Sequence, residues 1–205
     1  DPGDSDVTVT GLISPPRQTI LRWRHDKEVT EDVADRLWSL FGQVVHGILE
    51  RAGENENILT EDRLYKDVEY STDQTMKVGG QVDSMSLIEE GGKWAITDYK
   101  FVTVYRFMDG RVPVEYEQQL NAYAAIFRAN GFDVDRLDLL AIYRDWSVGR
   151  SNAGGGYPPK GAGIWSVPVW PKATADEWLM KKVTALHEAR ALEDDDLPEC
   201  TPEER

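Results

Sequence analysis

The spacing of apolar residues is helical between residues 30 and 52. One face of this segment repeats apolar residues every three or four positions, at Val33, Leu37, Leu40, Val44 and Ile48. Such spacing predicts an amphipathic helix. Its second face holds Trp38, Gly42, Val45, His46 and Leu49. Because both faces are largely apolar, we expect the helix to be sandwiched inside the domain, with His46 in the interior.

The pattern then becomes strand-like. Residues 64–70, 76–89 and 93–104 are rich in β-branched and aromatic side chains, which predicts three strands. Glu90-Gly91-Gly92 joins the last two, and so short a turn predicts antiparallel pairing. Residues 137–146 predict a strand apolar enough to lie mid-sheet, and residues 164–170 predict another. A short strand is also expected within residues 7–12.

Three more helices are expected. Ser14-Pro15-Pro16 resembles a helix start, with Ser14 as the N-cap. Pro113 begins a second helix that ends at Asn130-Gly131, and residues 173–192 form the last. The glycine-rich residues 147–163 between them predict a mobile loop. This order of elements predicts one α/β domain over residues 1–192, built on a mixed sheet.

Composition changes this picture mainly through charge. The chain has 205 residues and a net charge of −14, which argues against holding nucleic acid by bulk electrostatics. The segment from Glu188 to Arg205 contains eight acidic residues and two arginines, so it supplies −6 of that charge. Residues 193–205 are therefore expected to be a disordered acidic tail.

The compartment is constrained only weakly. No run approaches the roughly 18 apolar residues that cross a bilayer, so no membrane partner is expected. The single cysteine, Cys200, cannot form an internal disulfide or a cysteine-rich cluster, which fits the cytoplasm of a bacterial or phage-infected cell. No signal peptide is visible, and a first residue of Asp1 instead of Met leaves open an additional N-terminal segment.

The most basic stretch runs from Arg17 to His25 and contains Arg17, Arg22 and Arg24. It is a candidate phosphate-facing surface. An ordinary amphipathic helix with a solvated basic face explains the same residues equally well.

Two carboxylates follow apolar residues on neighbouring strands. Asp83 closes Gly80-Gln81-Val82-Asp83, and Asp98 stands in Ile96-Thr97-Asp98-Tyr99-Lys100. Asp98 and Lys100 are two residues apart, so their side chains point to one face of a strand. If that face is the interior, the charges must be paired or must bind something.

Phosphodiester hydrolysis uses such a set of groups. Two carboxylates hold divalent cations, and a nearby lysine orients water and offsets charge that builds on the phosphate. The alternative is a buried Asp98–Lys100 pair that only bridges strands. Gly42-x-x-x-His46-x-x-x-Glu50 and the helical pair Gln119 and Tyr123 also have ordinary explanations, as a satisfied core histidine and as packing.

Taken together and in this order, these motifs resemble the RecB-like branch of the PD-(D/E)XK nucleases over about Ser14 to Trp146. The resemblance implies a restriction-endonuclease-like core, with a central mixed β-sheet flanked by helices. It also implies metal ligation by His46, Asp83, Asp98 and the Tyr99 carbonyl, with Asp83, Asp98 and Lys100 catalytic. Gln119 and Tyr123 match the branch's Gln-x-x-x-Tyr signature, which positions substrate and the lysine.

The implied cofactor is Mg²⁺ or Mn²⁺, and the implied substrate is DNA with free ends or single strands. No iron–sulfur cluster is expected, because the four cysteines that some members carry are missing from this sequence. A recombination or replication protein is a further candidate partner. Three alternatives stay open: a structure-specific endonuclease with the same centre, an RNA substrate, and an inactive nucleic-acid- or protein-binding module.

Overall fold

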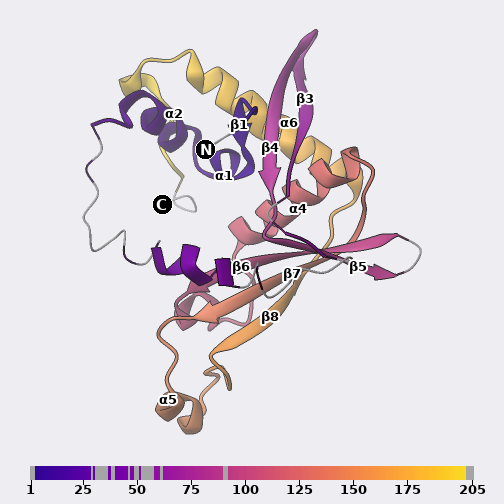
Figure 1. Cartoon of the computed structure of the whole chain (residues 1–205). Coiled ribbons are helices and arrows are strands. Elements are labelled where there is room, and N and C mark those ends of the chain that lie inside the picture. Colours follow the sequence, from indigo (N-terminus) through magenta and orange to yellow (C-terminus); the bar gives the residue numbers. More distant parts are fainter. Residues whose placement is uncertain are drawn as a thin grey trace.

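The chain folds into an α/β structure with two mixed sheets flanked by helices (Figure 1). The structure is a computed structural model, and it describes residues 3–28, 30, 37, 40–45, 47–48, 51, 58–60, 62–89 and 92–201. None of the helices among these residues is long and apolar enough to cross a membrane.

The larger sheet has five strands in the order β2-β5-β6-β7-β8. Their bounds are Ile58–Thr60, Ser84–Glu89, Lys93–Val102, Asp133–Tyr143 and Ala162–Val167. β5 and β6 pair antiparallel as predicted, and β6 pairs parallel with β7. β7 pairs with β6 on one side and with β8 on the other, which confirms its predicted place inside the sheet.

The smaller sheet has three strands in the order β1-β4-β3, with bounds Val7–Thr8, Gln74–Gln81 and Arg63–Ser71. The single strand predicted over residues 76–89 is therefore wrong, because β4 and β5 belong to different sheets. The break falls at Val82 and Asp83. Val82 is fully buried, so the apolar pattern continues through a point where the backbone changes partner.

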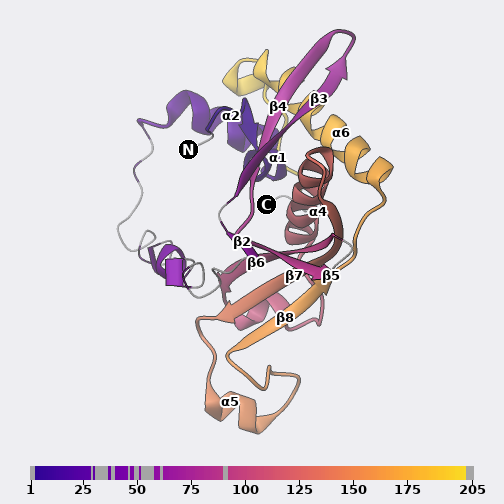
Figure 2. The same ribbon diagram turned by 45° about the vertical axis from the view of Figure 1, so that its right-hand side comes forward.

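Helix α4, Val114–Ala129, is the centre of the fold and contacts strands of both sheets as well as α1 and α6 (Figure 2). It starts after Pro113 and ends at Asn130, as predicted. The other helices are α1 Val9–Ile13, α2 Pro16–His25, α5 Val148–Ala153, α6 Lys172–Arg190 and the 3-10 turns η1 Val104–Phe107 and η2 Asp194–Asp196.

Some local predictions need correction. Residues 7–12 contain a strand of two residues and then α1, since the Thr8 side chain accepts a hydrogen bond from the Gly11 N–H and caps a helix there. Ser14 does not cap α2, whose N-cap is Pro15. It is the C-cap of α1 instead, and its hydroxyl donates to the Thr10 carbonyl of that helix. The predicted mobile loop at 147–163 contains α5, which ends where Gly154 adopts a φ of 75°.

The helix expected over residues 30–52 is not sandwiched where the structure describes it. Residues 40–45 are helical, but Leu40, Phe41, Val44 and Ile48 are each 53–60% exposed. These side chains take no part in the described core. Periodicity indicated a helix correctly, but the pattern carries no information about which surface covers its apolar face.

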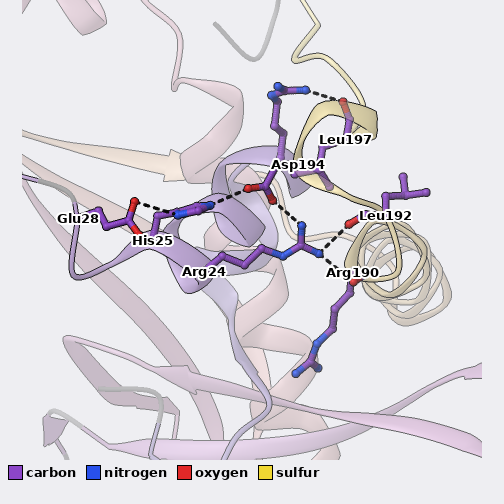
Figure 3. A network of polar contacts seen from close by, with 8 residues as sticks. Arg24, His25, Glu28, Arg190, Leu192, Asp194 and Leu197 are labelled. Atoms are coloured by element: carbon purple, nitrogen blue, oxygen red, sulfur yellow. Dashed lines mark hydrogen bonds and ion pairs between the residues drawn. The ribbon is translucent and has the colours of Figure 1, made fainter.

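The acidic tail differs from its expectation as far as Thr201, the last described residue. Leu197 is buried, and its carbonyl accepts a hydrogen bond of 2.6 Å from Arg17. Asp194 pairs with both Arg24 and His25 at 2.6 Å (Figure 3). Arg17, Arg24 and His25 of α2 thus attach this segment to the domain, through long-range contacts that composition alone does not reveal.

Candidate catalytic centre

Asp98 and Lys100 lie on one face of β6, as their spacing predicted. The Asp98 carboxylate oxygen Oδ2 is 2.5 Å from Nζ of Lys100. The Asp98 side chain is 4% exposed and that of Lys100 is 20% exposed. The two charges are thus removed from most of the solvent and compensate each other, as buried charges must.

Asp83 reaches the same place from the break between β4 and β5. Its Oδ2 accepts a hydrogen bond of 2.6 Å from the backbone N–H of Tyr99. Tyr99 stands between Asp98 and Lys100, so this bond fixes the Asp83 carboxylate beside the pair. The strand break therefore has a structural consequence, because it turns the chain where Asp83 meets β6.

The pKa of Lys100 reflects both carboxylates. Burial lowers this pKa, but the attraction of Asp98, and then of Asp83, outweighs burial and leaves the pKa above its ordinary value. Lys100 is therefore a stable cation at neutral pH, held next to two acidic groups.

Gln119 and Tyr123 approach the centre from α4. The Gln119 amide donates a hydrogen bond of 2.7 Å to the Tyr123 hydroxyl, as expected for residues one turn apart. Burial raises the pKa of Tyr123, and the charges of Asp98 and Asp83 raise it further. The charges of both carboxylates therefore act on the Tyr123 hydroxyl, which stays protonated at neutral pH.

Tyr116 is a further member of this cluster, which the motifs did not identify. The Lys100 ammonium lies 5.3 Å from the centroid of its ring, within range of a cation–π contact. Arg106 lies over the same ring at 5.6 Å and pairs with Glu115. The spacing from Tyr116 to Gln119 and Tyr123, three and seven residues, places all three on one helix face and was the available signal.

His46 lies outside the described residues, so the structure does not place this predicted ligand. Within the described residues, no group of three or more His, Cys, Asp or Glu side chains gathers as a metal site. Asp83 and Asp98 do supply carboxylate oxygens, the donors that Mg²⁺ and Mn²⁺ prefer. Mg²⁺ commonly uses only one or two protein carboxylates, with water and substrate oxygens completing its shell, so these two residues fit it.

Comparisons with known proteins support the fold alone. The sequence matches no family model and no curated protein. Among solved structures, the chain is similar to the crystal structure of SSO0001, with a TM-score of 0.61 and 15% sequence identity. The similarity covers 87% of this chain and 75% of that protein. At this identity the match is evidence for a shared α/β architecture and says nothing about chemistry.

Proposed function

We propose that this chain is a divalent-metal-dependent deoxyribonuclease that hydrolyses DNA phosphodiester bonds, acting as an exonuclease on DNA ends or single strands. The observation that carries the proposal is the meeting of Asp83, Asp98 and Lys100 at one point, although they come from separate segments. Two carboxylates and a cation are the groups that a metal-assisted phosphodiesterase needs. The resemblance of the motifs to RecB-like nucleases agrees with this chemistry.

Asp83 and Asp98 would hold Mg²⁺ or Mn²⁺, with the Tyr99 carbonyl and His46 as further candidate ligands. When bound, the ion supplies Lewis acidity toward the phosphate and lowers the pKa of a water molecule. The hydrogen bond from the Tyr99 N–H keeps the Asp83 carboxylate directed at the site. Because this donor belongs to the backbone of β6, both carboxylates are positioned by the same strand.

Lys100 would act on the substrate itself. Its ammonium remains protonated, so it can donate hydrogen bonds to the phosphate and offset the negative charge that grows during hydrolysis. The Tyr116 ring restricts where the Lys100 chain can lie. Gln119 and Tyr123 of α4 would position the substrate and Lys100, through an amide and a hydroxyl that already hydrogen-bond each other.

An endonuclease with the same centre is the second candidate, and an inactive binding module is the third. The sequence contains no recognisable module for reading bases, which favours processing of free ends over site-specific cleavage. Retention of all three charged residues favours catalysis over binding alone, since an inactive module has no need for a carboxylate pair beside a lysine.

Degradation of linear single- and double-stranded DNA, beside closed circular DNA, tests the proposal. Reactions contain Mg²⁺, Mn²⁺ or EDTA, and a labelled RNA strand is included. Metal-dependent loss of linear DNA alone would support the exonuclease, whereas cleaved circles would favour the endonuclease. Cleavage of RNA only would mean that the substrate is RNA instead of DNA. No cleavage in any reaction would favour the inactive binding module.

A further inference from the structure

Two polar hollows adjoin beside the candidate centre. The first encloses about 280 Å³ and is lined by Tyr123 together with Arg63 and Gln81 of the smaller sheet. Thr8 and Thr10, at the start of α1, also line this hollow. Tyr123 is hydrogen-bonded to Gln119 of the candidate centre, and Gln81 lies two residues before Asp83, so this hollow opens beside that centre.

The second hollow continues away from the centre. It encloses about 170 Å³, shares Thr8 and Thr10 with the first, and is lined at its far side by Gln18, Arg22 and Trp23 of α2. The two hollows adjoin at Thr8 and Thr10, at the start of α1. A path therefore leads from the candidate centre to the basic helix.

The charge of this path differs from that of the whole chain. The sequence contains 37 acidic residues, yet the described residues that line the two hollows include no Asp or Glu. Arg63 and Arg22 are their charged lining residues. A chain with a net charge of −14 thus presents a locally positive, hydroxyl-rich path, which suits phosphate groups.

Trp23 ends the path with an exposed aromatic face. Its side chain is among the exposed large hydrophobic residues, at 43%. The Arg190 guanidinium lies 5.7 Å from its ring centroid, within range of a cation–π contact, and adds positive charge beside the ring. An exposed aromatic ring beside arginines is a platform on which an unpaired base can stack.

The other basic residues of α2 have a different role. Arg24 pairs with Asp194 and donates hydrogen bonds to the carbonyls of Arg190 and Leu192, as Figure 3 shows. Arg17 lies seven residues earlier, on the same helix face, and binds the same C-terminal segment. Gln18 and Arg22 are four residues apart on another face, which lines the hollow. Arg17 and Arg24 therefore bind the C-terminal segment, whereas Arg22 lines the hollow.

We propose that the two hollows form a binding path for single-stranded DNA, with Arg63 and Arg22 contacting phosphates and Trp23 stacking on a base. The path deepens the proposed nuclease function and rests on it, since its inner end is defined by Tyr123. A single strand fits better than a duplex, because duplex bases stack on each other and offer no free face to Trp23.

Binding of a short fluorescein-labelled oligo(dT) in EDTA, measured by fluorescence anisotropy, tests the path without turnover. Trp23→Ala should weaken binding about tenfold, within the range for loss of one stacked base, and Trp23→Phe should recover part of it. Arg22→Ala should weaken binding several-fold and lower the log–log salt slope by about 0.7, the value for one phosphate contact on a single strand. Circular dichroism and the thermal midpoint show whether each variant is folded.

Arg24→Ala is the matched control, because it removes the same charge from the same helix but faces the C-terminal segment. It should bind within about twofold of wild type with an unchanged salt slope, as expected when no phosphate contact is lost. Equal binding by wild type, Arg22→Ala and Trp23→Ala would overturn the path, as would no binding of oligo(dT). Tighter binding of oligo(U) would overturn the assignment to DNA.

The cleavage assay separates this inference from the proposed function. If oligo(dT) binding depends on Arg22 and Trp23 but no DNA is cleaved, the path stands and the nuclease proposal fails. If DNA is cleaved while both variants bind and cleave like Arg24→Ala, the nuclease proposal stands and the path fails.

Discussion

The ammonium of Lys100 lies 2.5 Å from the carboxylate of Asp98, two residues earlier on β6. Their side chains are 20% and 4% exposed, so each charge depends on the other for compensation. The pair thus links the stability of the fold to the proposed chemistry, because a metal ion bound by Asp98 must share that carboxylate with Lys100. This relationship leads to separate predictions for the metal-free and the metal-loaded protein.

In the metal-free protein, Lys100→Met should lower the free energy of unfolding by about 3 kcal/mol, since it leaves the Asp98 carboxylate buried without its lysine. This is the lower end of the range for a broken buried pair, because the Lys100 side chain is 20% exposed. The double variant Asp98→Asn with Lys100→Met should recover most of that loss, because no lone charge remains. Urea unfolding in EDTA, followed by circular dichroism, measures both. If Lys100→Met unfolds like wild type, the charge pair does not contribute to stability as argued.

Mg²⁺ or Mn²⁺ should stabilise the folded protein, by about 2.7 kcal/mol at a concentration one hundred times the dissociation constant. Asp83→Asn and Asp98→Asn should each abolish most of this gain. Asp135→Asn is the control, since it removes an equal charge at an exposed pair with Lys93 on the larger sheet. Thermal unfolding with and without metal gives the shift, and an equal shift in all four proteins would refute the assigned ligands.

Gly80→Ala should destabilise the protein by about 1–2 kcal/mol and reduce cleavage, because β4 passes very close to α4. A Cβ at Gly80 would lie 2.9 Å from Cδ1 of Ile126 and 3.0 Å from Cδ1 of Tyr123. Gly149→Ala is the control, since its Cβ would meet only Ser147 Oγ, at 3.7 Å. Chemical denaturation and cleavage rates compare the two, and equal behaviour would show that Tyr123 is not confined by β4.

The attachment of the C-terminal segment should weaken as pH rises through neutrality. The hydrogen bond with Asp194 raises the pKa of His25 above its ordinary value. A raised pKa in the folded state means that the stabilisation is fully present below about pH 6.5 and is lost as pH rises through the folded-state pKa. Histidine NMR titration should show Asp194→Asn lowering the pKa of His25, and an unchanged pKa would contradict the contact.

Local sequence patterns were sufficient for most elements of the fold. Alternation and turn residues located β3, β6 and β7, and Pro113 with Asn130-Gly131 bounded α4. These elements were predictable because their signals lie within a few residues along the chain. The two-residue spacing of Asp98 and Lys100 likewise predicted that both side chains lie on one face of β6.

Tertiary partners were not predictable in the same way. Val82 is buried in an apolar run, so nothing local showed that β4 and β5 would enter different sheets. The contact of Asp194 with Arg24 joins residues 170 positions apart, and it ordered a segment whose composition indicated disorder. Tyr116 of α4 belongs to the candidate site because its ring contacts Lys100 of β6. The helical spacing of α4 is compatible with this contact but does not predict it.

The most direct test of the proposed function compares wild type with Lys100→Ala in the cleavage of end-labelled linear single-stranded DNA with Mg²⁺. If Lys100 is catalytic, wild type should cleave only with metal, and the variant should lose at least about a hundredfold in cleavage rate, the effect of removing one transition-state donor. The variant should remain folded and should still bind Mn²⁺ through Asp83 and Asp98. Equal cleavage by the two proteins, or cleavage that persists in EDTA, would contradict the assignment of this centre.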